Sequence, residues 1–301
     1  MSKSMRNRVH FLLQISIVQM AVACSLLIPQ GWGKNGPKKY ALLIGGGCAA
    51  YDTFASFYTN VEYVHKALKQ MGYHDGDIRV LFHGGKTHSH PLVEAVATKE
   101  NFIEELNRLA ETMDSNDSLL IFRSGHGNLD VQSKKYDTSS DHEDSFGEER
   151  MHRAGTLAVM NFPDGDLTCF EFEKSLKKIA AKQMVVILNQ CFCGQFTDIT
   201  LNIHNVVVVC ETKENELAIH DQRKTVRWKH NEWPFVKCFF DGFLQCDGTK
   251  KKRSVFNAFQ HLLHCNPNIE GIAIKADRPL LKENPVIKYG RGLKKGSVYI
   301  E

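Results

Sequence analysis

Apolar residues are arranged along this chain in short continuous runs, which alternate with amphipathic stretches. The continuous runs occupy residues 40–44, 78–82, 118–122, 184–188 and 206–209. A strand that is buried on both faces shows such a run rather than an alternating pattern. Between the runs, apolar residues recur three and four positions apart, as in helices that cover a sheet. The pattern predicts an α/β fold, a three-layer α/β/α sandwich with a mostly parallel central sheet.

Helix starts can be predicted from capping residues. Thr59 with Glu62, and Thr168 with Glu171, have the spacing of a capping box, in which each side chain bonds the other's backbone N–H. Thr98 opens another amphipathic stretch. We expect helices to begin at these three threonines. Two more helical patterns and one last apolar segment follow, at residues 235–244, 255–263 and 285–287.

The N-terminal end differs in composition from the rest of the chain. Basic residues precede an uncharged stretch at residues 11–33, and residues 21–23 (Ala-Val-Ala) offer a small-x-small cleavage signal. This pattern is typical of a secretory signal peptide. We expect a leader at residues 1–33, one domain at 38–301, and a secreted or periplasmic location. Membrane attachment is expected only through an uncleaved anchor or a lipidated Cys24.

Overall composition narrows the function only slightly. The net charge of +4 and the pI of about 8.5 give no reason to expect a nucleic-acid partner. Nine cysteines are present without a regular spacing, so their number does not fix the redox compartment. Residues 129–153 are polar and show neither helical nor strand periodicity, which predicts a long loop.

Two of the apolar runs lead to reactive side chains. The stretch 118–127 begins with an apolar run and contains His126 near its end. The stretch 184–196 likewise begins with an apolar run and contains Cys191. Carboxyl ends of parallel strands are where open sheets bind ligands. A thiol has a pKa near about 8.5 and attacks well only as the thiolate, so a neighbouring imidazole can activate it. The backbone N–H groups of Gly127 and Cys191 are the expected donors to a developing oxyanion.

The residues around this pair resemble a known family. Residues 124–127 (Ser-Gly-His-Gly), 190–196 (Gln-Cys-Phe-x-Gly-x-Phe) and 40–47 are similar to motifs of the legumain-like and caspase-like cysteine peptidases, in particular the bacterial-type legumain branch. The resemblance implies a caspase-like fold and a peptide or protein substrate. It also implies His126 as general base and acid, Cys191 as nucleophile, and neither a metal nor an organic cofactor.

The chain departs from that family at positions that matter. Legumains carry an asparagine that orients the histidine, and Gly47 stands there in this chain. Two residues before the nucleophile, where relatives set substrate preference, this chain has the neutral Asn189. Asn189 is therefore the candidate substrate-binding residue. Cleavage after asparagine does not carry over, because Tyr58 or Thr59 replaces the arginine that legumains use.

Other functions remain open from the sequence. A thioester at Cys191 could be captured by an amine, which would make the protein a transpeptidase or ligase. The same cleft could also serve a catalytically silent peptide-binding module. Residues 45–50 fit a G-x-G-x-x-A nucleotide motif, but the second strand ends in Phe82 and His83 rather than in an acidic residue. The histidines around residues 83–90 lack further ligands nearby, so no metal site is expected.

Overall fold

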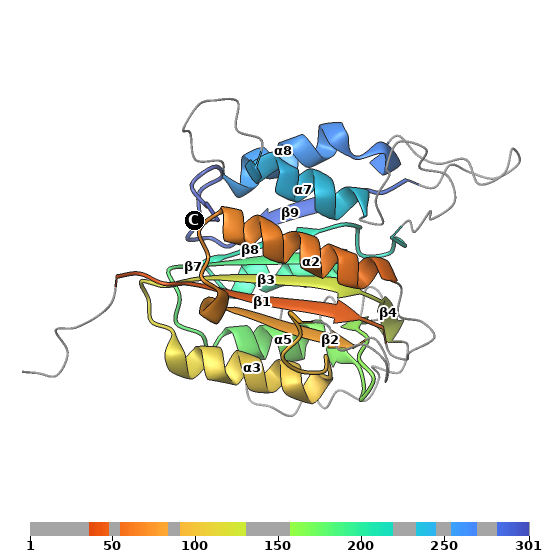
Figure 1. Cartoon of the computed structure of the whole chain (residues 1–301). Helices are drawn as coiled ribbons and strands as arrows, with labels where there is room; N and C mark the ends of the chain where they lie inside the picture. The colour runs from red at the N-terminus through yellow and green to blue at the C-terminus, as the bar shows by residue number, and fades with distance from the viewer. Residues whose placement is uncertain are drawn as a thin grey trace, which may run out of the picture. The chain divides into compact units, whose positions relative to one another are not determined.

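The apolar runs form strands of one six-stranded sheet (Figure 1). In order across the sheet, the strands are β2 (Ile78–His83), β1 (Lys39–Gly46), β3 (Ser118–Gly125), β7 (Gln183–Asn189), β8 (Val206–Cys210) and β9 (Val286–Tyr289). Neighbouring strands are parallel except for β9, which runs antiparallel to β8. The prediction of a mostly parallel sheet is confirmed. Burial of β3, β7 and β8 on both faces explains their continuous apolar runs.

The structure is a computed structural model that describes residues 36–47, 55–83, 91–130, 157–218, 233–244, 254–269 and 282–300. The expected leader, Cys24 and most of the expected loop at 129–153 lie outside these residues. The elements described here belong to one unit, Lys38–Glu301. Within the described residues, no helix has both the length and the apolar character needed to span a bilayer.

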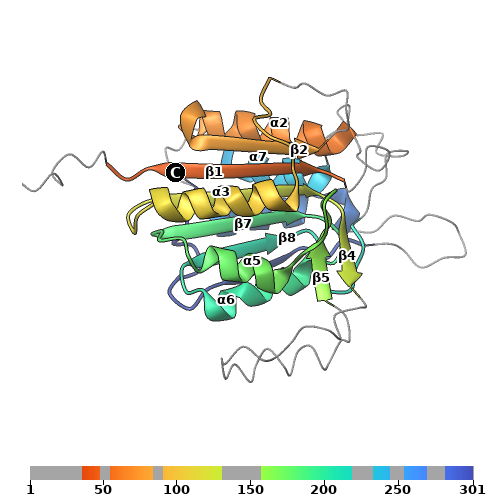
Figure 2. The ribbon, with the colours of Figure 1, turned by 90° about the horizontal axis from the view of Figure 1, so that it is seen from below.

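Helices cover both faces of the sheet, as Figures 1 and 2 show. One face packs against α2 (Ala55–Gln70), α7 (Pro234–Leu244) and α8 (Val255–Cys265). The other face packs against α3 (Lys99–Thr112), α5 (Cys169–Leu176) and α6 (Ile199–Asn202). Three short 3-10 turns complete the helical elements of the described part: η1 (Asp75–Asp77), η3 (Cys193–Asp198) and η4 (Pro267–Ile269). Each face of the sheet therefore has its own apolar core.

Two of the three predicted helix starts are confirmed. Thr98 caps α3 by accepting a hydrogen bond from a backbone N–H, and Thr168 forms a full capping box with Glu171 at the start of α5. The prediction at Thr59 was wrong, because α2 already contains Ala55 and Thr59 lies inside it. The Thr59 hydroxyl donates a hydrogen bond back to the carbonyl oxygen of Ala55 at 3.1 Å.

A second, smaller sheet was not predicted. It consists of β4 (Gly127–Asp130), β5 (Leu157–Met160) and β6 (Leu167–Thr168), which pair antiparallel. β4 follows β3 after a single residue, His126, and lies at the carboxyl end of the main sheet (Figure 1). These strands have four residues or fewer, so they leave almost no periodic signal in the sequence.

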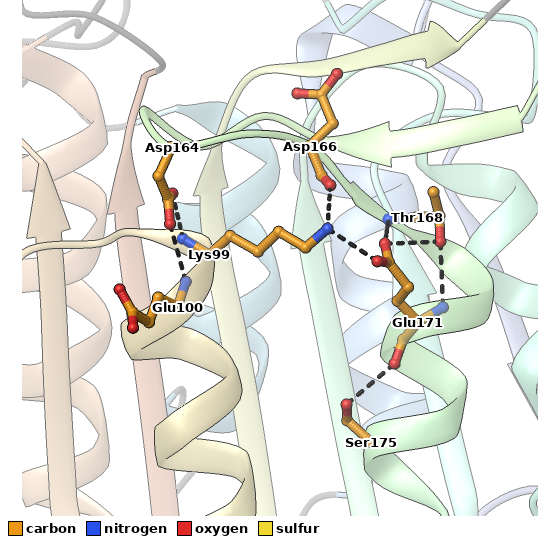
Figure 3. Close-up of polar contacts among 7 residues, drawn as sticks. All are labelled: Lys99, Glu100, Asp164, Asp166, Thr168, Glu171 and Ser175. Atoms are coloured by element: carbon orange, nitrogen blue, oxygen red, sulfur yellow. Dashed lines mark hydrogen bonds and ion pairs between the residues drawn. The ribbon is translucent and has the colours of Figure 1, made fainter. Parts of the chain in front are cut away.

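The connection from β5 to β6 is fastened to the start of α3 (Figure 3). The carboxylate of Asp164 accepts hydrogen bonds from the backbone N–H groups of Lys99 and Glu100, at 2.6 and 3.0 Å. The Lys99 ammonium donates to the backbone carbonyl of Asp166 and to the carboxylate of Glu171, both at 2.8 Å. These contacts join α3, α5 and the small sheet beside the carboxyl edge.

Candidate active site

His126 and Cys191, the candidate dyad, follow directly on two neighbouring strands. β3 pairs in parallel with β7, with Ser124 opposite Asn189, and the chain continues two residues further to His126 and Cys191. Both residues therefore lie at the carboxyl edge, where open sheets bind ligands. A side chain at Gly127 would collide with the carbonyl oxygen of Cys191. The two segments that carry the dyad are thus in contact.

The side chain and backbone of His126 are both held by neighbours. The ring of Phe57, fully buried on α2, meets the imidazole edge-on, with 5.2 Å between ring centroids and 88° between ring planes. The same phenyl ring contacts the indole of Trp233, with 5.3 Å between centroids. The carbonyl oxygen of His126 accepts a hydrogen bond from the backbone N–H of Asn161 at 3.2 Å. The Phe57 contact had no signal in the sequence pattern.

The thiol of Cys191 is nearly buried, with 9% of the residue exposed. Its sulfur accepts a hydrogen bond from the backbone N–H of Ala218 at 3.3 Å. Burial raises the pKa of the thiol, and the hydrogen bond from Ala218 partly opposes that rise because it favours the thiolate. The protonated thiol is therefore favoured at neutral pH, and a reaction that uses this sulfur as a nucleophile would require a base.

The segment after β8 lies against the turn that carries Cys191. Phe192 has a left-handed backbone conformation, with φ of 57°, and its N–H donates to the carbonyl oxygen of Glu216 at 2.8 Å. A side chain at Gly194 would collide with the backbone of Lys213 and Glu214. Glycine at 194 thus permits the close approach of the two segments.

Asn189 lies beneath the carboxyl edge and is fully buried. Its carboxamide oxygen accepts hydrogen bonds from Ser124 at 2.7 Å and from Asn60 at 3.1 Å, and its nitrogen donates to Glu211 at 2.7 Å. Asn60 also donates to Ser124 and accepts from the backbone N–H of Trp233, each at 3.0 Å. The residue expected to contact substrate is therefore bonded to protein groups in this conformation.

Glu211 and Glu283 extend this network as two buried acids. Burial, together with the neighbouring Glu283, raises the pKa of Glu211 well above its ordinary value. The Glu283 carboxylate accepts hydrogen bonds from the side chains of Asn266 and Asn268, at 2.7 and 2.8 Å. Neither acid was identified as a site residue from the sequence. The sequence signals are that Glu211 directly follows an apolar strand and that residues 283–285 (Glu-Asn-Pro) resemble a C-terminal landmark of the peptidase family.

The described residues add no support for a nucleotide site at residues 45–50 or for a metal site at the histidines of residues 83–90. Gly45 and Gly46 belong to β1, whereas the rest of the glycine-rich motif beyond Gly47 lies outside the described residues, as do His88 and His90. Among the residues that the structure describes, no group of three or more His, Cys, Asp or Glu side chains could hold a metal ion.

The fold and the sequence together define a caspase-like cysteine peptidase. Residues 39–200, more than half of the 301-residue chain, match the metacaspase, peptidase C14 domain family. The chain therefore belongs to this family. The comparison supports the caspase-like part of the resemblance and does not confirm the legumain-like branch.

Solved structures with the same fold include the following two. One is GSU0716 from Geobacter sulfurreducens, with 13% identity and a TM-score of 0.52 over 88% of this chain and 100% of that chain. The other is caspase-1 from Spodoptera frugiperda, with 11% identity and a TM-score of 0.52 over 85% of this chain and 88% of that chain. At these identities the likeness concerns the fold alone. A search of curated proteins found no match.

Proposed function

We propose that this protein is a cysteine endopeptidase that uses His126 and Cys191 as a dyad. The observation that supports the proposal is the parallel pairing of β3 with β7, which brings both residues to one edge, with Gly127 packed on the Cys191 carbonyl. The family and the caspase-like fold agree with this chemistry.

In the proposed reaction, His126 takes the proton from Cys191, and the sulfur attacks the carbonyl carbon of the scissile peptide bond. The N–H groups of Gly127 and Cys191 would stabilise the oxyanion of the tetrahedral intermediate. His126 then returns the proton to the leaving amine, and the C–N bond breaks to leave a thioester. A water molecule, deprotonated by His126, hydrolyses the thioester and restores the thiol.

The substrate would be an extended peptide that lies across the carboxyl edge. Asn189 would contribute to substrate binding indirectly, by fixing Ser124 and Glu211 beneath that edge, since its carboxamide oxygen already accepts two hydrogen bonds. The proposed chemistry needs neither a metal nor an organic cofactor. We further propose that the enzyme is exported under the direction of residues 1–33.

A panel of peptidyl acyloxymethyl ketones, varied at the residue next to the reactive group, tests the proposal. We expect covalent labelling of the parent protein, loss of labelling in Cys191→Ala and His126→Ala, and full labelling in Cys169→Ser, whose thiol is buried at the start of α5. A parent protein that no probe labels, or labelling that survives Cys191→Ala, would contradict the proposal.

A peptide library analysed by mass spectrometry would then define the products. Cleavage inside peptides is expected for an endopeptidase. Ligated products with an added amine, in place of hydrolysed ones, would show a transpeptidase that uses the same thioester. A parent protein that no probe labels and that cleaves no peptide would favour the catalytically silent peptide-binding module.

A further inference from the structure

Arg123 is a buried cation on the α3 side of β3. It points to the same face as Leu119 and Ile121, which belong to the apolar core beneath α3 and α5, yet only 2% of the residue is exposed. A buried guanidinium is costly unless its N–H groups are hydrogen-bonded. Arg123 lies three residues before His126, so its hydrogen-bond partners show which segments near the histidine it connects.

The guanidinium connects the two segments that carry the dyad. One terminal nitrogen donates to the side-chain oxygen of Gln190, the residue immediately before Cys191. The other donates to the backbone carbonyl of Asn161 at 2.8 Å, and the backbone N–H of Asn161 in turn donates to the carbonyl of His126. Arg123 therefore bonds directly to the nucleophile segment and, through one residue, to the histidine.

Further contacts fix the side chains of Arg123 and Gln190. The guanidinium lies over the ring of Phe162, with 5.2 Å from its carbon to the ring centroid. The side-chain nitrogen of Gln190 donates to the carbonyl oxygen of Val159 on β5 at 3.3 Å. Asp164 and Asp166, a few residues further along, are bonded to the start of α3 (Figure 3). The small sheet is thus a fixed support rather than a loose loop.

The glycines on either side of His126 leave room for the side chains of Arg123 and Gln190. A Cβ atom at Gly125 would lie 3.2 Å from the guanidinium carbon of Arg123, and one at Gly127 would lie 2.6 Å from the amide nitrogen of Gln190. The first distance is tight and the second is too short for real atoms. Arg123 and Gln190 therefore pack directly against the backbone on both sides of His126.

We propose that Arg123 and Gln190 form a positioning pair that holds His126 against Cys191. Through the contacts described above, the pair fixes the backbone segments that carry the reacting atoms. This inference rests on the proposed function, because it assigns a purpose to the pair only if the dyad is reactive. Small displacements of reacting groups cost catalysis far more than they cost stability.

The test compares labelling rates by the best acyloxymethyl ketone of the panel between about pH 5 and pH 9. The variants are Arg123→Met, Gln190→Met and the double variant, with Arg123→Lys as the conservative replacement. Ile121→Val serves as the matched control for stability. It removes one methyl group from the same core face of β3, two residues before Arg123. Rates are measured well below each variant's unfolding temperature, so that every sample is folded.

We expect each methionine variant to be labelled at least about tenfold more slowly, with a shifted pH profile, because the imidazole and thiol no longer share a fixed geometry. The double variant should be no slower than the worse single variant, since both remove one interaction. Arg123→Lys should recover part of the rate, and Ile121→Val should keep the parent's rate and profile.

Other outcomes separate the two proposals. A labelled parent together with an equally fast Arg123→Met, or with losses that simply add in the double variant, would overturn the positioning pair and leave the dyad intact. A parent that is not labelled, or a Cys191→Ala variant that is, would overturn the proposed function itself.

Discussion

Replacement of Phe57 by leucine should weaken both the fold and the proposed chemistry. The phenyl ring is fully buried and makes edge-on contacts with the rings of His126 and Trp233. An aromatic pair contributes about 0.5–1.5 kcal/mol beyond the area that it buries, so two lost pairs should cost about 1–3 kcal/mol. For a domain of this size, that loss lowers the Tm by roughly 2–12 °C.

The loss of reactivity should exceed what the loss of stability explains. Leucine leaves space beside the imidazole, and His126 can then rotate away from the geometry needed for proton transfer. We expect the labelling rate of Cys191 to fall on the order of 10- to 100-fold at a temperature where the variant is folded. Thermal unfolding by circular dichroism and labelling kinetics with the same probe measure the two effects separately.

Phe240→Leu is the matched control for this prediction. Phe240 is equally buried, and its ring contacts are to Phe122, Phe239 and Phe243, at 6.0, 5.5 and 6.3 Å between centroids. It should lose comparable stability and keep its labelling rate. A Phe57→Leu variant that is labelled as fast as the parent, or a Phe240→Leu variant that is slowed equally, would refute the role of Phe57.

Two further predictions concern stability. Because burial raises the pKa of Glu211 above 4.5, the folded state keeps a proton that the unfolded chain loses, so stability should fall as the pH rises from 4.5 through the raised pKa. Glu211→Gln should flatten this decline in Tm between about pH 5 and pH 8; a decline as steep as the parent's would contradict it. Thr168→Ala removes the capping box of α5 and should cost about 1 kcal/mol. Urea unfolding measures this cost, with Thr112→Ala at the exposed end of α3 as the control. Equal unfolding midpoints for Thr168→Ala and the parent protein would contradict the role of the cap.

The sequence predicted those features that depend on local signals. Residues 184–188 and 206–209 were correctly predicted as strands, because a continuous apolar run can be recognised without knowing which strands lie beside it. The helix starts predicted at Thr98 and Thr168 were confirmed, because a helix cap is formed by residues that lie within four positions of each other. Thr59 failed because a Thr-x-x-Glu spacing also occurs inside a helix, and only the preceding residues distinguish the two.

Long-range side-chain contacts could not be predicted in this way. Asn60 and Asn189 bond to each other across 129 residues of sequence, and Arg123 reaches Gln190 across 67. Nothing in the local pattern pairs them, because Asn60 lies inside α2, whereas Arg123, Asn189 and Gln190 follow apolar runs on other elements. The sequence predicted that His126 and Cys191 follow neighbouring strand ends, whereas the side chains that support this candidate site required coordinates.

The arrangement of these supports follows from the alternation of side chains along a strand. Consecutive residues point to opposite faces, so Arg123 and Gln190 face α3 while Ser124 and Asn189 face α2. Each face of the sheet therefore ends in a polar pair that joins the end of β3 to the end of β7, just before His126 and Cys191. A slip of one residue between these strands would exchange the faces and leave a guanidinium and two carboxamides without their partners in a buried site. If the proposed positioning pair holds, the same contacts that make the slip unfavourable would also orient His126 and Cys191, and one group of residues would set both register and reactivity.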